Sequence, residues 1–237
     1  MSQRYFVGAT LAGAGGRVTL TGPEAHHLAR VMRATTGEEF TLFDGRGGEC
    51  RARIVLVSKQ AVEFEILKRL EFDRETLAPL ELAVALPKGD RQHWLVEKAV
   101  ELGVTTLLPL ITERGVAEPG DAARERMERW GVEACKQCGR NRLLEVAAPL
   151  TIEALARRTC AGVKLIAHPG GESAATFDAV SSGVTIAVGP EGGFTEGEVQ
   201  TLLAADWRQV SLGPRILRVE TAAVALAAFF GLRDLTA

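Results

Sequence analysis

Near the C-terminus an uncharged apolar run ends in a glycine-rich turn, and this junction constrains the fold more than any other part of the chain. Residues 184–188, Val-Thr-Ile-Ala-Val, are typical of a strand buried on both faces of a parallel sheet. Gly-Pro-Glu-Gly-Gly-Phe follows at 189–194. Thr195 and Glu198 then form a capping box, which predicts a helix start. Ligands of open α/β sheets bind at the carboxyl ends of strands, so this turn is a candidate ligand site.

Strands and helices alternate in the same way from residue 80 onward. We expect strands at 80–86, 105–111, 163–167, 184–188 and 209–212, and helices at 91–102, 122–138, 195–205 and 221–230. This alternation predicts an α/β fold, with a parallel sheet covered by helices on both faces.

The first seventy residues follow a different pattern. Short apolar runs between turn signals predict strands at 17–20, 39–43, 50–57 and 62–66, with a short helix at 24–33. Several short strands of this kind suggest a small barrel. Residues 69–79 are polar, end in proline and resemble a linker. We therefore expect two domains, 1–72 and 73–237.

A second turn between a strand and a helix spans 212–221, Leu-Gly-Pro-Arg-Ile-Leu-Arg-Val-Glu-Thr. Together with the turn at 189–193 it can form a cleft with apolar walls and a few polar groups, the usual composition of a ligand site. The competing interpretation is that the first segment is only a tight turn and the second only a loop with solvated arginines. Neither the dinucleotide fingerprint G-x-G-x-x-G nor the phosphate-binding loop G-x-x-x-x-G-K-[ST] occurs at these turns, which argues against a dehydrogenase or an NTPase.

Charge and cysteine content limit the remaining classes of protein. The net charge of -2 excludes a globally basic nucleic-acid-binding protein but not a local basic patch. Residues 124–142 form such a patch, since six Lys/Arg against three Glu give +3; a solvated helix face explains it equally well. The start lacks the pattern of a signal peptide, and four cysteines without framework spacing favour a reducing compartment, so we expect a cytoplasmic protein. Cys135 and Cys138 lack a second ligand pair, so no metal is expected.

Eight fragments in this order closely resemble the RsmE family of ribosomal small-subunit RNA methyltransferases, in the SPOUT superfamily. The fragments are 4–6 (RYF), 26–33 (HHLARVMR), 42–49 (LFDGRGGE), 88–91 (KGDR), 96–104 (VEKAVELGV), 133–142 (EACKQCGRNR), 189–195 (GPEGGFT) and 212–222 (LGPRILRVETA).

The resemblance implies an N-terminal PUA-like β-barrel that binds RNA and a C-terminal SPOUT domain with a trefoil knot. It implies a homodimer that uses S-adenosyl-L-methionine to methylate N3 of a uridine in 16S rRNA of the small ribosomal subunit. The cofactor-binding residues that it implies are Ala167, His168, Pro169, Gly189, Pro190, Glu191, Gly192, Gly193, Leu212, Gly213, Ile216, Leu217 and Thr221.

Uridine N3 carries a proton that must leave as the methyl group arrives. We hypothesise that Arg218 stabilises the developing uracil oxyanion, and that Glu191 or Glu220 accepts the proton. The candidate RNA-binding residues are Arg4, His27, Arg30, Arg33, Lys88, Arg91, Lys136, Gln137, Arg140, Asn141 and Arg142.

Three alternatives remain open at this point. The chain can be a SPOUT methyltransferase acting on tRNA or on another rRNA position. It can be a non-catalytic RNA-binding or assembly factor with the same fold. An α/β oxidoreductase is disfavoured because the dinucleotide fingerprint is missing.

Overall fold

The computed structural model describes residues 4–116, 120–160, 162–177 and 182–232. The chain divides into two compact units, which are treated separately below. Unit 1 comprises Met1–Glu75 and Val132–Leu143, and unit 2 comprises Thr76–Gly131 and Leu144–Ala237.

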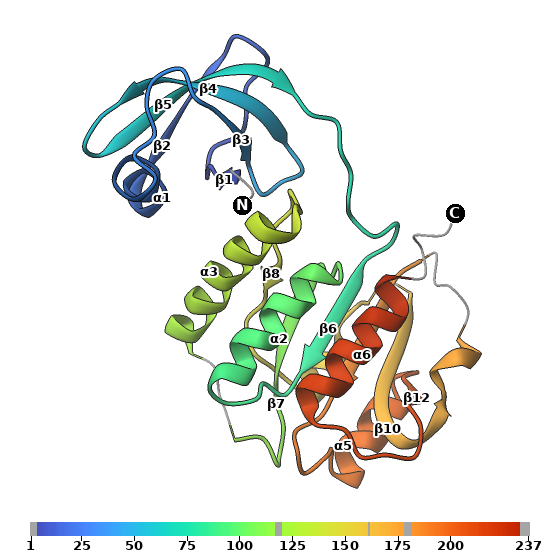
Figure 1. Ribbon diagram of the computed structural model, residues 1–237. Coiled ribbons are helices and arrows are strands. Elements are labelled where there is room, and N and C mark those ends of the chain that lie inside the picture. The colour runs from blue at the N-terminus through green and yellow to red at the C-terminus, as the bar shows by residue number, and fades with distance from the viewer. Residues whose placement is uncertain (1–3, 117–119, 161, 178–181, 233–237) are drawn as a thin grey trace. The chain divides into compact units, whose positions relative to one another are not determined.

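Unit 1 is built on a curled five-stranded sheet (Figure 1). Its strands are β1 (Arg4–Phe6), β2 (Arg17–Thr21), β3 (Glu39–Phe43), β4 (Glu49–Val57) and β5 (Ala61–Arg69), in the order β1-β3-β4-β5-β2. The four predicted strands are confirmed; the sequence analysis missed β1, which pairs in parallel with β3. The other pairings are antiparallel. Alternate side chains of each strand point into one core, in which the Phe40 ring meets Tyr5 and Phe64 edge-on.

A helical segment occurs where the helix over 24–33 is predicted, but it begins earlier and is only partly α-helical. Helix α1 (Gly22–His26) begins earlier, because Pro23 near its first turn has the fixed φ that a helix start requires. The chain then continues as a π-helical turn, η1 (His27–Val31). Arg33 has a left-handed φ of 53° and lies outside the helix.

Unit 2 contains a seven-stranded sheet in which every pairing is parallel, as predicted. Its strands are β6 (Leu80–Val84), β7 (Thr106–Ile111), β8 (Glu145–Val146), β9 (Leu150–Thr151), β10 (Val163–Ser173), β11 (Val184–Val188) and β12 (Arg208–Ser211). The order is β12-β10-β11-β6-β7-β8, with β9 also paired to β7. All five residues of β11 are buried, as its apolar composition predicts.

Helices cover both faces of this sheet. They are α2 (Asp90–Glu101), α3 (Asp121–Cys138), α4 (Ile152–Arg157), α5 (Glu196–Leu203) and α6 (Val219–Gly231); α3 extends into unit 1. Helices α2 and α6 lie side by side on one face (Figure 1). On the other face, α4 and α5 bury Leu155 and Leu202 against alternate residues of the central strands. The sequence analysis missed α4, β8, β9 and the short 3-10 helix η2 (Ala174–Thr176).

Strand β10 differs most from its prediction. It does not end at Ala167 but resumes after a bulge, so that Ala167 and Glu172 both align with Val210 of β12. Residues 168–171 therefore loop out of the strand. A Cβ atom at Gly171 would lie 2.6 Å from the backbone of Gln209 and Val210, so the second part of β10 requires glycine there.

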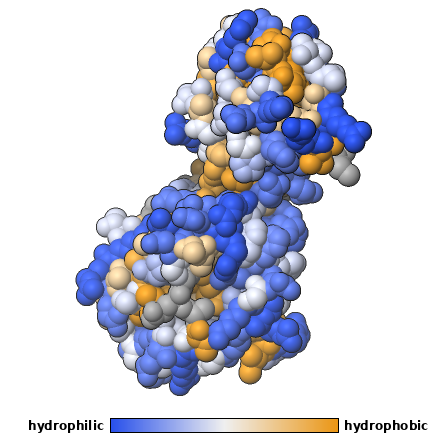
Figure 2. All heavy atoms as spheres, turned by 90° about the vertical axis from the view of Figure 1, so that its left-hand side faces the viewer, coloured by the Kyte–Doolittle hydropathy of each residue, from blue (hydrophilic) through white to orange (hydrophobic). Residues whose placement is uncertain are grey.

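Hydrophilic side chains cover much of the face shown in Figure 2 on each unit, and hydrophobic side chains gather in smaller patches. Within the four described ranges of the chain, no helix combines the length and the apolar character needed to span a bilayer.

A partly buried ion pair connects the sheet of unit 2 to the segment after α4. The Glu81 carboxylate on β6 accepts hydrogen bonds from Arg158 (2.6 and 2.8 Å) and from the Thr185 hydroxyl (2.7 Å). Burial raises the pKa of Glu81, but these hydrogen bonds outweigh it, and the pKa lies below the ordinary 4.5.

Replacing Glu81 by Gln should lower the free energy of unfolding of unit 2 by about 1–3 kcal/mol at neutral pH, because Arg158 loses its charged partner. A carboxyl group with a lowered folded-state pKa stabilises the fold above its unfolded pKa, and this contribution disappears as pH falls through the folded value. The difference between wild type and Glu81→Gln should therefore shrink below pH 4.5.

Urea unfolding followed by tryptophan fluorescence measures this, since Trp94, Trp130 and Trp207 all lie in unit 2. Glu97→Gln, which removes an exposed carboxylate on α2, is the control and should change the stability by less than about 0.5 kcal/mol. An effect of Glu81→Gln that does not vary with pH would contradict the assignment.

Candidate active site

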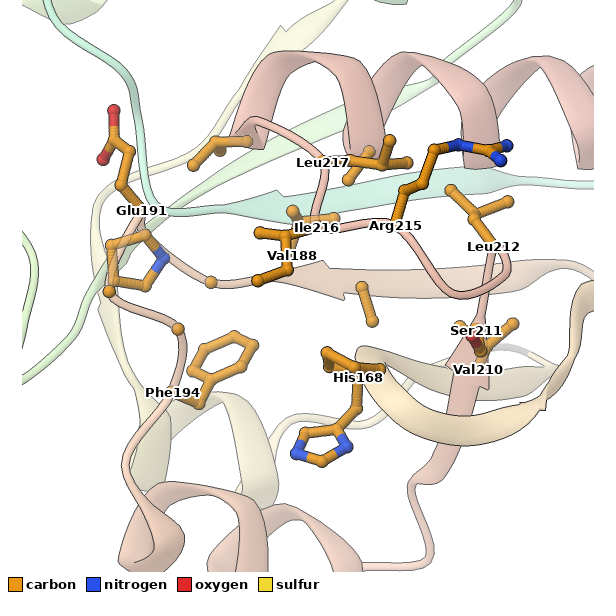
Figure 3. A pocket seen from close by; sticks show the side chains of 18 of the residues that line it. His168, Val188, Glu191, Phe194, Val210, Ser211, Leu212, Arg215, Ile216 and Leu217 are labelled. Carbon is orange, nitrogen blue, oxygen red and sulfur yellow. The ribbon is translucent and has the colours of Figure 1, made fainter.

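A pocket of about 300 Å³ lies at the carboxyl ends of β11 and β12 and at the bulge of β10. Three loops of unit 2 form it: the bulge of β10, the turn after β11 and the loop after β12. Figure 3 shows Phe194 and His168 on the walls of this pocket, together with Leu212, Arg215 and Ile216 from the third loop. A concave site with a mainly apolar lining at this edge of a parallel sheet is where a small ligand is expected.

The turn after β11 needs glycine for identifiable reasons. The Gly193 N–H donates to the Pro190 carbonyl (2.8 Å), and Gly193 has a φ of +67°. A Cβ atom at Gly189 would lie 3.0 Å from the Phe194 ring, so a side chain there would displace an aromatic wall of the pocket.

Contacts from β7 and α5 hold this turn in place. Arg114, which follows β7, donates to the Gly192 carbonyl (2.8 Å). The predicted capping box of α5 is confirmed: the Thr195 N–H donates to Glu198 (2.8 Å), and the Glu198 N–H donates to the Thr195 hydroxyl (3.3 Å). The second oxygen of Glu198 accepts the Glu113 N–H (2.8 Å). The turn is therefore preorganised by the helix behind it.

The other two loops supply one polar ring and one exposed apolar side chain. His168 Nδ1 accepts a hydrogen bond from the Gly170 N–H (3.2 Å), which leaves Nε2 as the available ring nitrogen. In the third loop the Gly213 N–H donates to the Ser211 hydroxyl (3.2 Å). Ile216 lines the pocket although the residue is 91% exposed, so it provides free apolar surface for a ligand.

The structure gathers in this pocket all of the cofactor-binding candidates named from the sequence except Thr221, which is exposed on α6 outside the lining. It adds lining residues that the sequence analysis did not name: Val188, Phe194, Val210, Ser211, Arg215, Val219 and Ala222. Phe194 could have been found, since it lies inside the 189–195 fragment. Arg215, Val219 and Ala222 could have been found in the same way, since they lie inside the 212–222 fragment. Val188, Val210 and Ser211 lie at the ends of strands, where a one-residue shift decides which side chain faces the pocket.

Arg91, at the start of α2, pairs with both candidate proton acceptors. Its Nη1 lies 3.2 Å from Glu191 Oε1 and 3.6 Å from Glu220 Oε2. Glu191 lines the pocket and is half exposed, whereas Glu220 is buried and does not line it. Arg91 thus links the turn after β11 to the first turn of α6, which gives it a role within unit 2 that differs from its predicted one as an RNA contact.

Arg218 occupies the N-cap position of α6, between the pocket-lining residues Leu217 and Val219. Its side chain is exposed, and in the part of the chain that the structure describes it forms no ion pair. An unpaired guanidinium beside the pocket can stabilise negative charge that develops on a bound group.

The structure divides the predicted RNA-binding residues of unit 1 into exposed and buried side chains. His27, Arg30, Arg33, Gln137 and Arg142 are exposed, as is Lys88 of unit 2. Arg4, Arg140 and Asn141 are buried and serve the fold instead.

These three residues have internal partners. Arg4 pairs with Glu49 (2.5 Å), Arg140 pairs with Glu75 (2.5 Å), and Asn141 donates to the Phe72 carbonyl (3.0 Å). Sequence patterns could not separate them from the exposed arginines, because a buried ion pair and a phosphate contact use the same residue types.

Lys136 is largely covered and lies between Glu24 (2.8 Å) and Glu133 (3.0 Å), with its ammonium group over the Tyr5 ring. Burial lowers the pKa of Lys136, but the two carboxylates outweigh it and raise the pKa above its ordinary value. Lys136 therefore stays protonated, but its positive charge is already paired with two carboxylates of unit 1, unlike the charge of a free RNA-contacting lysine.

Cys135 and Cys138 do not form a ligand set with other residues. No group of three or more His, Cys, Asp or Glu side chains suited to a metal ion occurs among the described residues. Burial raises the pKa of the Cys135 thiol to about 12, and its Sγ–H donates to the Arg142 carbonyl. Burial likewise raises the pKa of Cys50 to about 11.

Comparison with known proteins now defines the class. Residues 74–231 match the RNA methyltransferase domain family, and residues 20–67 match the RNA methyltransferase PUA domain family. The chain is thus an RNA methyltransferase family member with an N-terminal PUA domain.

The chain belongs to the ribosomal RNA small subunit methyltransferase E family, so the resemblance found in the sequence is confirmed. The relative from Bacillus subtilis is 34% identical over 236 residues, which covers 93% of this chain and 92% of the relative. The relative from Synechocystis is 35% identical over 218 residues, covering 89% and 71%.

Two solved structures are similar over nearly their whole length. One is a ribosomal RNA small subunit methyltransferase E from Neisseria gonorrhoeae bound to S-adenosyl methionine, with 33% identity, 96% of each chain covered and a TM-score of 0.90. The other is the putative methyltransferase Lpg2936 from Legionella pneumophila with bound SAM, with 32% identity, 97% of each chain covered and a TM-score of 0.88.

The cysteine environments predict a labelling pattern. A thiol reagent added to the native protein at neutral pH should modify the partly exposed Cys138 and Cys160, and should spare Cys50 and Cys135. The two spared thiols are buried and stay protonated, and the thiolate is the reactive form. Mass spectrometry of the labelled peptides measures this, with urea-unfolded protein as the fully labelled control. Rapid labelling of native Cys135 would contradict the inert role assigned to it.

Proposed function

We propose that this protein transfers a methyl group from S-adenosyl-L-methionine to N3 of a uridine in 16S rRNA of the small ribosomal subunit. The observation that carries the proposal is the single pocket formed by the three loops that the sequence resemblance assigns to the cofactor. Membership of the small subunit methyltransferase E family and similarity to two chains with the bound cofactor support it.

The pocket has the character that this cofactor requires. Its walls are mainly apolar, which suits an adenine ring, and its turns expose backbone at Gly193 and Gly213, where a Cβ atom would meet nothing within 4 Å. When bound, the cofactor supplies a methyl group on a positively charged sulfur. The residues proposed to hold it are Ala167, His168, Pro169, Gly189, Pro190, Gly192, Gly193, Leu212, Gly213, Ile216 and Leu217.

Arg218 is the proposed stabiliser of the uracil oxyanion. Loss of the N3 proton spreads negative charge onto the neighbouring uracil oxygens, and a guanidinium without a carboxylate partner can receive that charge. An arginine already committed to an ion pair, such as Arg91, would do so less effectively.

Glu191 is the proposed proton acceptor, directly or through water. It lines the pocket, whereas the other candidate, Glu220, is buried against Arg91 outside the lining. Arg91 orients the Glu191 carboxylate and is therefore a proposed positioning residue.

The exposed basic residues of unit 1, Arg30, Arg33 and Arg142, together with His27 and Gln137, are the proposed RNA contacts there, and Lys88 is the proposed contact on unit 2. We further propose the homodimer and the trefoil knot that the resemblance implies, together with the cytoplasmic location and the domain limits 1–72 and 73–237 that the sequence predicts.

Incubation of the protein with small ribosomal subunits and isotope-labelled S-adenosylmethionine, followed by nucleoside mass analysis, tests the proposal. We expect one labelled N3-methyluridine in 16S rRNA. Methylation of tRNA or of another base would replace the proposed substrate. Tight RNA binding without cofactor binding in calorimetry would favour a non-catalytic assembly factor.

Arg218→Ala should reduce kcat by roughly 10²- to 10³-fold, the usual effect of removing one oxyanion-stabilising donor. Cofactor affinity measured by calorimetry should stay unchanged, because Arg218 does not line the pocket. Arg218→Lys should keep part of the activity, since it retains the charge. Full turnover in Arg218→Ala would exclude the role.

Glu191→Gln and Glu220→Gln form a matched pair, since each removes one carboxylate partner of Arg91. Only Glu191→Gln should lower kcat by about 10²-fold or more, the contribution of a positioned proton acceptor. Single-turnover methylation with saturating cofactor measures this. Equal losses in both variants would show that Arg91 pairing, and not proton transfer, accounts for the effect.

A further inference from the structure

Unit 1 contains a second cleft, of about 460 Å³, that has no part in the pocket described above. The segment 69–73 forms one side, and the turn at Gly47 with Asn141 and Arg142 forms the other. The lining combines two arginines, one phenylalanine and two carboxylates, which are Arg69, Arg142, Phe72, Glu71 and Asp73.

Arg142 is oriented but unpaired. A Cβ atom at Gly47 would lie 2.9–3.2 Å from three guanidinium atoms of Arg142, so the guanidinium rests on the bare backbone of a glycine whose φ is +102°. Within the described residues the Arg142 side chain has no hydrogen bond or ion pair. Arg69 also lacks a carboxylate partner in these ranges and is held by the Leu11 carbonyl (3.3 Å). Two positioned cations are therefore free to meet an anionic ligand.

Phe72 presents an aromatic surface next to these cations. The residue is 55% exposed, which is unusual for phenylalanine, and the Arg74 guanidinium lies 4.8 Å from the centre of its ring. The Phe72 carbonyl accepts from the buried Asn141 side chain (3.0 Å), and the Asn141 carbonyl accepts from the Gly47 N–H (3.0 Å). The backbone that carries the ring is thus hydrogen-bonded across the cleft.

The carboxylates of Glu71 and Asp73 favour a nucleotide over a free phosphate ion as the ligand of this cleft. Asp73 accepts from the Glu75 N–H (3.0 Å), and both Asp73 and Glu71 are exposed. With two acids beside two arginines, the cleft has no net charge to attract a free phosphate ion. A nucleotide fits better, because its phosphate can pair with arginine, its base can stack on an aromatic ring, and its amino groups can donate to carboxylates.

We propose that this cleft binds one unpaired nucleotide of the RNA substrate, with the base on Phe72 and the phosphate on Arg142. This inference rests on the proposed function, since it assumes an RNA substrate. Unit 1 would then have a defined binding site for one single-stranded nucleotide, in addition to the exposed basic residues proposed above as RNA contacts.

Fluorescence anisotropy with a labelled single-stranded oligocytidylate, measured over a range of salt concentrations, tests the inference. Phe72→Ala should weaken binding roughly 5- to 100-fold with little change in salt dependence, as expected for lost stacking. Phe72→Trp should restore binding. Arg142→Ala should weaken binding and reduce the slope of log affinity against log salt by about 0.7, the value for one phosphate contact to a single strand.

Leu56→Ala and Arg53→Ala are the controls, because they remove an exposed apolar side chain and an arginine that pairs with Glu39 from β4, outside the cleft. Both should bind like wild type. If wild type binds the oligonucleotide and methylates small subunits while the Phe72 and Arg142 variants bind as well as wild type, the cleft inference alone is overturned. If wild type binds no RNA and methylates none, the proposed function falls with it.

Discussion

Strands β10, β11 and β12 run parallel, so the bulge of β10 meets the carboxyl ends of β11 and β12 at one edge of the unit 2 sheet, and the candidate active site depends on that shared direction. The loops that leave these ends come from distant parts of the sequence but are forced together by strand pairing. All five residues of β11 are buried, and the Thr185 hydroxyl donates to Glu81 on the neighbouring strand β6 (2.7 Å), so a slip in register would break this buried contact. The pocket is therefore a consequence of sheet geometry before any side chain is considered.

The side chains around this edge fall into two groups: those that hold the loops in place and those that are available to act on a substrate. Arg91 connects the turn after β11 to α6, and Arg114 and Glu198 hold the same turn from β7 and α5. Arg218, next to these paired groups, has no ionic partner in the described part of the chain. In unit 1, Arg142 likewise has no ionic partner among the described residues, whereas Arg4 and Arg140 form buried ion pairs with Glu49 and Glu75. Whether an arginine is paired thus distinguishes the residues available for substrate from those that hold the fold.

Periodicity and turn chemistry predicted most of this fold because they act locally. The capping box at Thr195 and Glu198 and the apolar strand at 184–188 are examples. The bulge of β10 could not be predicted, because glycine at 171 is required by the backbone of β12, some forty residues away in sequence. The division of the arginines into buried and exposed was hidden for the same reason, since their partners Glu49 and Glu75 come from other segments of unit 1. The knot and the dimer came from family resemblance alone.

A crystal structure with S-adenosylhomocysteine, the unreactive product of the methyl donor, tests the central claim most directly. The account predicts the compound between residues 167–169, 189–193 and 212–217, in contact with all three loops. Finding it bound elsewhere, with these loops free of ligand, would contradict the assignment of the pocket and with it the proposed reaction.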